Sequence, residues 1–483
     1  MNKQLGRIAV SFIVMLVALA VNLSFIQVVG ADSIDNRAGN RRNLLREYSR
    51  ERGAILVAGS PVASSVATND TLTHLRTYAN GPAYATVTGF YSFLYGATGI
   101  ERAENPVLSG SADTLVIDRL QQLFAGRKPR GGAVALTIDP LAQQAAWKAL
   151  RGRTGAVVAI EPSTGRLLAV VSSPSFDPNT LSSHDSASIK KAYADYLADP
   201  KQPMLNRALA RTYPPGSTFK LVTAAAALAT GKYTAETVIP GPKTYRLPLT
   251  TKDLNNWSKS ACGPGGKVTL ARALAVSCNT AFAWLGNQVG ADALRAQARA
   301  FGFDFATAVP MTAAVSRFPA DPDEPQTALS AIGQFDVRAT ALQMAQVGAG
   351  IANGGVVMAP HLVQEVLGPD LSVLSKTQPR ALSTAMTPTN AQTLLQMMEG
   401  VVARGTGGNA RIPGVRVAGK TGTAQTQPGT PPHAWFVGIA PVDNPQVAVA
   451  VVVENGGGSA EVSGNRLAAP VAQAVMKAVL AKK

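Results

Sequence analysis

Histidine and cysteine, the residues that most often build metal sites, are scarce in this chain of 483 residues. The sequence has two cysteines and four histidines, and the histidines are scattered along it. Metal sites group such residues at short, regular spacings, and no grouping of that kind is present. We therefore expect neither a metal nor an organic cofactor. The histidines are His74, His184, His361 and His433.

Charged residues are also few, and acidic residues are the scarcer sign. Charged residues make up 15% of the chain, with 29 acidic against 45 basic residues and a net charge of +16. A basic chain suits anionic partners such as nucleic acid, a membrane surface or an anionic polymer. Because the sequence lacks a zinc-finger spacing, an RNA-binding signature and any run rich in lysine and arginine, we expect no nucleic acid among the partners.

One long apolar run lies near the N-terminus. Residues 8–29 carry no charge, and these 22 residues are enough to span a bilayer. A cleaved signal peptide, with Val29-Gly30-Ala31 as its cleavage site, is the alternative, but the length of the run favours an uncleaved anchor. Six arginines follow between residues 37 and 52, and this charge bias alone would place the body inside the cell. Long domains cross membranes largely regardless of charge, so the orientation stays open here.

The remaining pattern predicts more than one domain, since 46% of the residues are apolar and the chain is long enough for two or three cores. Residues 40–53 predict a short exposed helix or an extended stem, and residues 54–59 and 84–96 predict strands. Residues 126–132, GRKPRGG, combine charge, proline and paired glycine as linkers do. The predicted parts are residues 1–30, a tail and membrane anchor; residues 31–130, a β-rich domain; and residues 131–483, a larger domain.

The larger part begins and ends with strands and has alanine-rich helices between them. This order predicts one antiparallel sheet assembled from distant segments, with the final amphipathic helix packed on it. We therefore expect an α+β fold. The predicted strands are residues 155–162, 166–174, 415–425, 433–441 and 446–456, and the predicted final helix is residues 469–483.

A hydroxyl and an amine share one face of a predicted helix in RTYPPGSTFKLVTAAAALAT, where a Pro-Pro-Gly turn leads to Ser217 and Lys220 follows three residues later. Serine is a poor nucleophile unless a base takes its proton, and lysine serves as that base when burial lowers its pKa. The apolar run after Lys220 predicts such burial, so the pair suits a serine that forms an acyl-enzyme. A second S-x-x-K, Ser188 to Lys191, predicts a solvated helix face.

Two further motifs sharpen this weak signal. Residues 277–279, SCN, form an S-x-N just before a predicted helix, and residues 420–422, KTG, lie in a predicted strand. The order S-x-x-K, S-x-N, K-T-G is that of serine β-lactamases and penicillin-binding proteins. Residues 463–465 form another S-x-N, but they follow K-T-G and break the order. His433 precedes a strand near K-T-G, and we interpret it as an ordinary loop histidine rather than one that lines a cleft.

With these motifs in order, the chain resembles a class B penicillin-binding protein, and within that class the actinobacterial penicillin-binding protein A group. The resemblance extends over nearly the whole chain, and its narrower signals are the N-terminal stretch and the cysteine within S-x-N. It implies a membrane anchor, an extended pedestal or dimerisation-like domain, and a transpeptidase domain with a central antiparallel sheet flanked by helices. The matching stretches are YATVTGFYSFLYGATGIERAENPVL, GAVVAIEPSTGRLLAVVSSPSFDPN, YPPGSTFK, VSCNTAF, GKTGTA, TPPHAWFVGIAP and VAVAVVVENG.

The resemblance also implies an activity: a peptidoglycan D,D-transpeptidase that cross-links stem peptides through a serine acyl-enzyme and is inhibited by covalent acylation by β-lactams. In the implied roles, Ser217 attacks a D-alanyl-D-alanine stem peptide and Lys220 takes the serine proton. Ser277 relays a proton towards the leaving amine, and Lys420 keeps the network positive. Asn279 contacts the substrate amide and Lys220.

The same resemblance assigns substrate binding to Thr421, Gly422 and Thr423, with the two threonines holding the substrate carboxylate. The backbone N–H groups of Ser217 and Thr423 would form the oxyanion hole. The family works outside the cytoplasmic membrane, so the resemblance implies a single-pass membrane protein with an extracytoplasmic body. It further implies a membrane glycan polymerase of the shape and division family as a partner.

An extracytoplasmic body makes a disulfide between Cys262 and Cys278 the expected state. They are the only two cysteines, and 15 residues lie between them. The bridge would tie the S-x-N turn to the glycine-rich segment at residues 261–267. The alternative is a pair of free, buried thiols.

Two other classes of function compete with this interpretation. A serine hydrolase, either a D,D-carboxypeptidase or a β-lactamase, needs a base that activates water for deacylation. Between Ser217 and Ser277 the only acids are Glu236 and Asp253, without the E-x-x-L-N string that such a base would occupy. A sensor that only reports acylation needs a signalling module across the membrane, and seven residues before the apolar run do not provide one. We therefore expect a transpeptidase.

Overall fold

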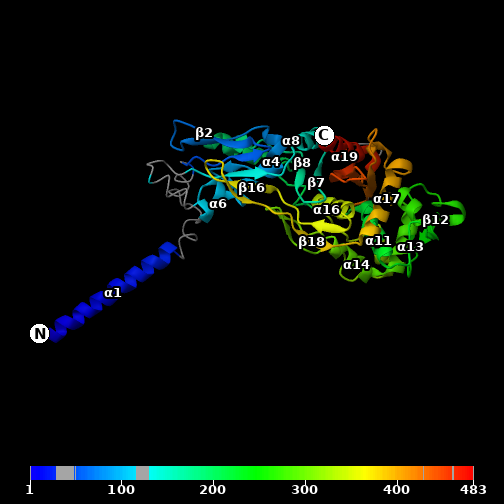
Figure 1. Cartoon of the computed structure of the whole chain (residues 1–483), viewed down its shortest axis with the longest axis horizontal. Coiled ribbons are helices and arrows are strands. Elements are labelled where there is room, and N and C mark those ends of the chain that lie inside the picture. Colours follow the sequence, from blue (N-terminus) through cyan, green and yellow to red (C-terminus); the bar gives the residue numbers. More distant parts are fainter. Residues whose placement is uncertain are drawn as a thin grey trace.

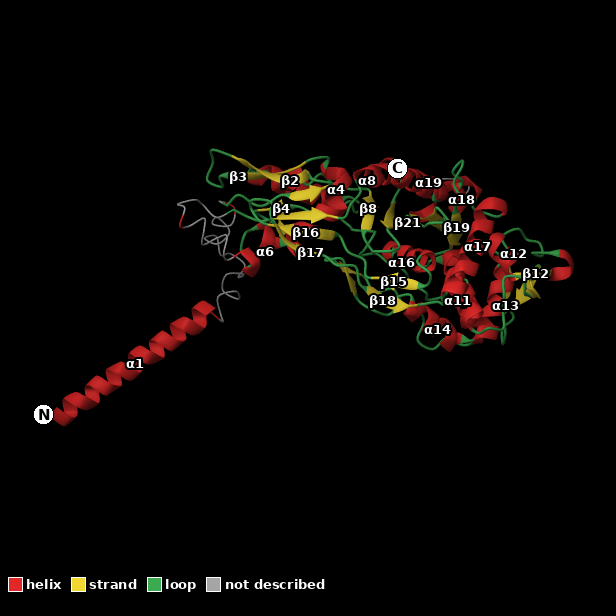
Figure 2. Cartoon of the chain, viewed as in Figure 1, coloured by secondary structure: helices red, strands yellow, loops and turns green. Residues whose placement is uncertain are grey.

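The computed structural model describes residues 2–28, 48, 50–115, 124, 130–427, 429–458 and 462–481. Its elements form an N-terminal helix, a six-stranded sheet, and a larger unit in which helices cover a five-stranded sheet (Figures 1 and 2). These are the layers of the predicted α+β fold. The predicted stem at residues 40–53 and the predicted linker at residues 126–132 lie largely outside the described residues.

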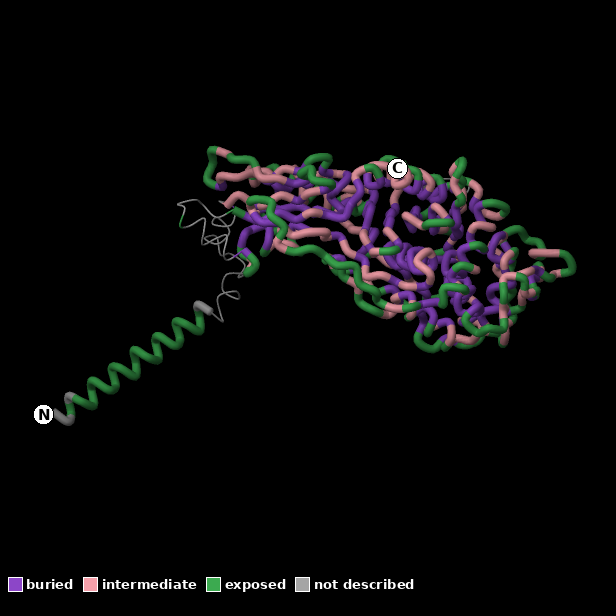
Figure 3. Tube along the Cα trace, viewed as in Figure 1, coloured by how far each residue is buried: buried purple, intermediate pink, exposed green. Residues whose placement is uncertain are grey.

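The N-terminal helix α1 (Asn2–Val28) contains the predicted membrane anchor. A stretch of 18 residues within residues 6–26 has a mean hydropathy of 2.5, and residues 6–26 are exposed in Figure 3. At 1.5 Å per residue, a helix of 21 residues is about 30 Å long, which matches the hydrocarbon core of a bilayer. By length and composition α1 is able to cross a membrane, although a signal sequence would pass the same test.

The six-stranded sheet is built from both predicted parts of the chain. Its order is β17-β16-β6-β1-β2-β3, and neighbours are antiparallel except β1 and β6, which are parallel. Three of its strands come from residues after 130, so this sheet joins the pedestal to the larger unit. The strands are β1 (Ile55–Val57), β2 (Ser60–Ala67), β3 (His74–Tyr78), β6 (Ala133–Leu136), β16 (Val363–Leu367) and β17 (Val373–Lys376).

One strand prediction in the pedestal is wrong. The segment 84–96 begins in helix α4 (Gly81–Thr88) and continues as only two short strands, β4 (Tyr91–Ser92) and β5 (Gly96–Ala97). Asn80 adopts a left-handed conformation before the helix, a proline occupies its first turn, and Gly89 ends it. Almost every residue of α4 is buried, so its sequence shows neither the helical nor the strand period.

The five-stranded sheet has the order β19-β20-β21-β7-β8, and all its neighbours are antiparallel. The first and last thirds of the larger unit thus form one sheet, as the sequence predicts. Because β19 is at the edge, one side of its backbone pairs with no strand of this sheet. The strands are β7 (Gly155–Ile160), β8 (Leu167–Ser173), β19 (Ala418–Ala424), β20 (His433–Ala440) and β21 (Val447–Val453).

Helices cover both faces of this sheet. Successive side chains of a strand point to opposite faces, and both sets are buried here, so each face needs a covering layer. One face packs with α8 (Pro140–Leu150) and the predicted final helix, α19 (Ala469–Leu480). The other packs with α16 (Ala341–Ala352), and α11 (Lys220–Ala229) belongs to the same buried core. Figure 3 shows the resulting buried core along the centre of the larger unit.

The remaining elements surround these layers. The helices are α5 (Gly99–Ala103), α6 (Asn105–Leu108), α9 (Asn179–Ser182), α10 (Ser186–Ala198), α12 (Leu270–Ala275), α13 (Asn279–Val289), α14 (Ala291–Ala300), α15 (Glu324–Ser330), α17 (Pro388–Arg404) and α18 (Gly464–Leu467). The short strands are β9 (Val238–Pro240), β10 (Thr244–Arg246), β11 (Asp253–Asn255), β12 (Lys267–Thr269), β13 (Thr307–Ala308), β14 (Thr312–Ala313), β15 (Val356–Met358) and β18 (Ala381–Thr384). The 3₁₀ turns are η1 (Asp113–Leu115), η2 (Gly216–Phe219), η3 (Pro264–Gly266), η4 (Gly408–Ala410) and η5 (Glu454–Gly458).

Candidate active site

Ser217 lies in the 3₁₀ turn η2, which continues directly into α11. Two prolines before the turn fix their φ angles, and Gly216 then takes φ +52°. A Cβ on Gly216 would come within 2.8 Å of the Thr423 carbonyl oxygen, so glycine allows the turn to touch β19. The local sequence thereby places Ser217 beside the end of the K-T-G strand.

Lys220 is the first residue of α11 and is completely buried. Its Nζ donates to the Ser277 carbonyl oxygen at 2.7 Å, to Asn279 Oδ1 at 2.8 Å and to Ser277 Oγ at 3.4 Å. Burial, with a further contribution from the charge of Lys420, lowers the pKa of Lys220 well below its ordinary value. A neutral amine at this position is a proton acceptor.

The S-x-N turn follows the end of α12. The Ser277 N–H donates to the Leu274 carbonyl and the Cys278 N–H donates to the Ala273 carbonyl, which is the pair of bonds of a Schellman motif. Ser277 occupies the left-handed position of that motif, with φ +59°, where glycine is usual. This conformation directs the Ser277 hydroxyl to both lysines, and Asn279 then begins α13.

Lys420 approaches the same hydroxyl from β19. Its Nζ donates to Ser277 Oγ at 2.8 Å and to the Thr421 carbonyl oxygen at 2.9 Å. Burial lowers the pKa of Lys420 to about 7. The Ser277 hydroxyl is therefore shared by two buried amines, and it forms a hydrogen-bonded path between them.

The rest of the K-T-G strand packs on η2, the turn that carries Ser217 and that we call the serine turn. Thr421 Oγ1 lies 2.6 Å from Thr406 Oγ1, and Thr423 remains partly exposed. A Cβ on Gly422 would lie 2.9 Å from Trp435 Cβ and 3.1 Å from the Pro215 carbonyl oxygen, so only glycine fits between β20 and the turn. Eight residues predicted for catalysis and substrate binding thus meet in one place: Ser217, Lys220, Ser277, Asn279, Lys420, Thr421, Gly422 and Thr423.

Asn256, which the sequence analysis does not single out, holds the start of α13 in place through its side chain. Its Oδ1 accepts from the N–H groups of Asn279 and Thr280 at 2.9 and 3.1 Å, so it caps α13 from outside the helix. Its Nδ2 donates to the carbonyls of Pro242 and Ser260. An asparagine 23 residues before the S-x-N asparagine carries no local signal of this role.

A disulfide joins Cys262 to Cys278 and fixes the same loop to the S-x-N turn. Cys278 is almost fully buried and immediately precedes α13. The loop that contains Asn256 is therefore tied to the candidate site by a side-chain cap and by a covalent bond.

The second S-x-x-K, which we set aside, lies elsewhere. Ser188, on the exposed face of α10, hydrogen-bonds to Asp185, and Lys191 pairs with Asp195 at 2.6 Å. His433 is not a loop residue: it begins β20, is buried, and accepts a hydrogen bond from the Asn455 N–H at 3.0 Å. Burial lowers the pKa of His433 to about 4. Among the described residues, no three His, Cys, Asp or Glu side chains are grouped as a metal site requires.

Comparison with known families gives a match to the penicillin binding protein transpeptidase domain over residues 155–477, which is more than half of the chain. This chain belongs to the penicillin-binding protein transpeptidases. The pedestal matches the penicillin binding protein A dimerisation domain over residues 52–134.

Individual relatives cover the whole length of this penicillin-binding protein. It is 47% identical to the peptidoglycan D,D-transpeptidase PbpA of Mycolicibacterium smegmatis and 46% identical to that of Mycobacterium tuberculosis, in each case across 99% of both chains. Penicillin-binding protein A of M. tuberculosis, in its ceftriaxone acyl-enzyme complex, matches with a TM-score of 0.88 at 46% identity, over 90% of this chain and 100% of that one. The predicted relationship to the penicillin-binding protein A group and the predicted fold class are confirmed.

Proposed function

We propose that this penicillin-binding protein is a peptidoglycan D,D-transpeptidase in which Ser217 forms the acyl-enzyme. The observation that carries the proposal is the buried amine of Lys220, which lies one turn after Ser217 and is hydrogen-bonded to Ser277 and Asn279, and whose pKa is lowered by burial. The acyl-enzyme complexes of the M. tuberculosis relative with ceftriaxone and penicillin G support the same reaction class.

In the first half-reaction, Ser217 Oγ attacks the carbonyl carbon between the two terminal D-alanines of a stem peptide, and Lys220 takes the hydroxyl proton. The N–H groups of Ser217 and Thr423 bind the oxyanion that forms. The proton then passes from Lys220 through the Ser277 hydroxyl to the leaving nitrogen, and the peptide bond breaks. D-Alanine departs with a neutral amine, and the rest of the peptide stays esterified to Ser217.

In the second half-reaction, the amine of another stem peptide attacks the ester and gives its proton back to Ser217 along the same path. A cross-link forms and the serine is regenerated. Thr421 and Thr423 hold the carboxylate of the donor, and Asn279 binds its amide. Gly422 keeps the edge of β19 close to the turn, so that the donor peptide can lie along that edge. A β-lactam enters as a mimic of the donor and remains attached to Ser217.

The acceptor distinguishes this function from its rivals. We would measure D-alanine release from a stem pentapeptide by the full-length protein, with and without an added amine acceptor. A transpeptidase forms the transfer product in proportion to acceptor, and Ser217→Ala forms none. Release that is fast and independent of acceptor indicates a D,D-carboxypeptidase. Acylation without turnover in either condition indicates a sensor.

We assign three parts to the chain: residues 1–30 as tail and anchor, residues 31–130 as pedestal, and residues 131–483 as the transpeptidase domain. The apolar helix α1 and the cell-wall function of the relatives support a single-pass protein with its body outside the cytoplasmic membrane. A membrane glycan polymerase is the partner that such an enzyme requires for its substrate strands. Protease added to intact spheroplasts should digest the body of the protein, whereas a body inside the cell would be protected.

A further inference from the structure

A buried ionic cluster lies behind the serine turn, where β21 ends. Glu454 is 6% exposed, and its Oε1 accepts from Tyr213 Oη at 2.7 Å and from Arg207 Nε at 3.0 Å. Arg211, whose side chain is 40% exposed, borders the cluster, and its Nη1 lies 3.8 Å from the same oxygen. None of these four side chains has a role in the transfer reaction described above.

The cluster connects three distant segments of the chain. The Glu454 N–H donates to the Thr154 carbonyl at 2.8 Å, so the Glu454 backbone is fixed where β21 ends, beside the start of β7. The other nitrogens of Arg207 donate to the backbone carbonyls of Lys201 and Gln202 at 2.5 and 2.9 Å. Because a buried charge is costly unless it is paired and hydrogen-bonded, these contacts hold Glu454 and Arg207 in one arrangement.

Tyr213 links the cluster to the nucleophile. Its ring packs edge-on against His433 and Trp435 of β20, with centroid distances of 5.3 and 5.9 Å. Its backbone exchanges two hydrogen bonds with Ala339, at 2.9 and 2.8 Å. Trp435 Nε1 donates to the Pro214 carbonyl at 3.1 Å. Only two prolines and one glycine separate Tyr213 from Ser217, and prolines with fixed φ transmit a displacement instead of absorbing it.

We propose that Glu454 is a positioning residue for acylation. Through Tyr213 it fixes the position of the serine turn relative to β19. It would not touch the substrate, and the proposal rests on Ser217 being the nucleophile. When the carboxylate is lost, Tyr213 loses its hydrogen-bond acceptor and Arg207 its partner, so the turn shifts relative to Thr423. A displacement of about 1 Å at a reacting group costs on the order of 100-fold in rate.

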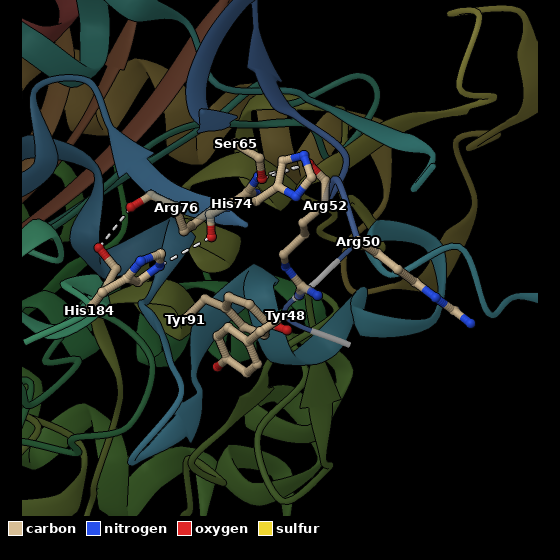
Figure 4. Close-up of a pocket in the computed structure, with 9 residues that line it drawn as sticks. Tyr48, Arg50, Arg52, Ser65, His74, Arg76, Tyr91 and His184 are labelled. Atoms are coloured by element: carbon tan, nitrogen blue, oxygen red, sulfur yellow. Dashed lines mark hydrogen bonds between the residues drawn. The ribbon is translucent and has the colours of Figure 1, made fainter. Parts of the chain in front are cut away.

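The pedestal offers a matched control with the same chemistry. Glu101 is completely buried and accepts from Arg52 Nε at 2.6 Å, from Arg76 Nε at 2.7 Å and from Tyr78 Oη at 3.0 Å. Figure 4 shows Arg52 and Arg76 among the side chains that line a pocket between the pedestal and residues 182–184. Both clusters thus place one glutamate between arginines and a tyrosine, but only that of Glu454 adjoins the serine turn.

The test compares acylation and stability in the full-length protein. We would prepare Glu454→Ala, Glu454→Gln, Tyr213→Phe and Glu101→Ala, and follow their reaction with a fluorescent penicillin by stopped flow. The measurement separates the dissociation constant of the non-covalent complex from the rate constant of acylation. Melting temperatures of the four variants report the structural cost.

We expect Glu454→Ala to acylate about 10- to 100-fold more slowly, with a little-changed dissociation constant. Glu454→Gln should recover part of the rate, because its carboxamide oxygen still accepts from Tyr213, and Tyr213→Phe should lose several-fold. Glu101→Ala should melt at a lower temperature and acylate within about twofold of the wild type. Equal acylation rates in Glu454→Ala, Glu101→Ala and the wild type would overturn the proposal.

Two further outcomes have a defined meaning. If Glu454→Ala does not fold, Tyr213→Phe decides, because it removes a single hydroxyl, and acylation at the wild-type rate then counts against the proposal. Failure of the proposed function looks different, since then the wild type itself is not acylated or Ser217→Ala is acylated as fast.

Discussion

At the scale of single residues, the candidate site depends on two amines that are kept out of water. Lys220 and Lys420 are both completely buried, and no acidic side chain is hydrogen-bonded to either in the described part of the chain. Burial without a counter-charge favours the neutral form of an amine, so the pKa of each lysine is lowered and each is able to act as a proton acceptor. The hydroxyl of Ser277 joins them, in a backbone conformation that serine seldom adopts.

Lys420 should make the stability of the protein rise with pH. In the unfolded chain Lys420 keeps its proton up to about pH 10.5, whereas in the folded protein it releases the proton at about pH 7. Between these values the unfolded state binds more protons, so the free energy of unfolding increases as the pH rises. Lys420→Met removes the group. We expect the melting temperature of the wild type, relative to that of Lys420→Met, to increase from pH 7 to pH 10. If the two melting temperatures change with pH in parallel, Lys420 is not buried as a neutral amine.

Variants of Ser277 should lose activity, and their stability should depend on how well the new residue tolerates the left-handed backbone conformation. Its φ of +59° costs a residue with a Cβ about 1 kcal/mol relative to glycine. We therefore expect Ser277→Gly to melt at a higher temperature than Ser277→Ala, while both variants lose the proton relay and acylate slowly. Thermal unfolding and penicillin labelling of the two variants measure this difference. Ser277→Ala as the more stable variant would show that the turn is not left-handed.

The catalytic motifs are readable from the sequence because each is a local pattern with its own chemistry. Ser217 and Lys220 are one helical turn apart, and the apolar run that buries Lys220 follows immediately. Asn256 and Glu454 are not readable, because their partners lie 23 and 241 residues away along the chain. Nothing in the spacing of such residues identifies them until the fold brings the partners together.

At the scale of elements, the S-x-N turn is held by the loop that precedes it. Asn256 caps α13 from this loop, and the bridge from Cys262 to Cys278 ties the loop down again. The neighbouring Asn255 accepts the Asn279 Nδ2–H through its backbone carbonyl at 3.2 Å. A helix that starts in the active site is thus fixed by side chains outside it, and the direction of Asn279 depends on them.

Asn256→Ala should lower both stability and acylation. It leaves two N–H groups at the start of α13 without their acceptor, which costs about 1–3 kcal/mol. Asn255→Ala is the matched control, because the Asn255 side chain is exposed and accepts a hydrogen bond from Thr244. We expect the melting temperature and the acylation rate to fall in Asn256→Ala and to change little in Asn255→Ala. Equal behaviour of the two variants would exclude the capping role.

Some elements of the fold can be predicted from the sequence more reliably than others. The hairpin of β7 and β8 is predicted by two apolar runs on either side of a Pro-Ser-Thr-Gly turn, and helix α19 by its amphipathic pattern, and the structure contains both where expected. Helix α4 was predicted as a strand because nearly all its side chains are buried, and a segment buried on all sides has no polar face from which a period can be measured.

At the scale of the whole molecule, the five-stranded sheet gathers the site from distant parts of the chain. Its edge strand β19 brings Lys420 to the start of α11 and to the S-x-N turn, although 200 residues separate Lys420 from Lys220. The sequence predicts that the ends of the larger part form one sheet. It does not predict the six-stranded sheet, because β16 and β17 lie more than 200 residues after β6, which pairs with β16.

The central claim is that Ser217, and not the second S-x-x-K serine, carries the acyl group. The direct test is the intact mass of the full-length protein after incubation with penicillin, followed by peptide mapping of the adduct. The account predicts one penicilloyl group, located on Ser217, with no adduct in Ser217→Ala and a normal adduct in Ser188→Ala. An adduct on Ser188, or undiminished labelling of Ser217→Ala, would contradict it.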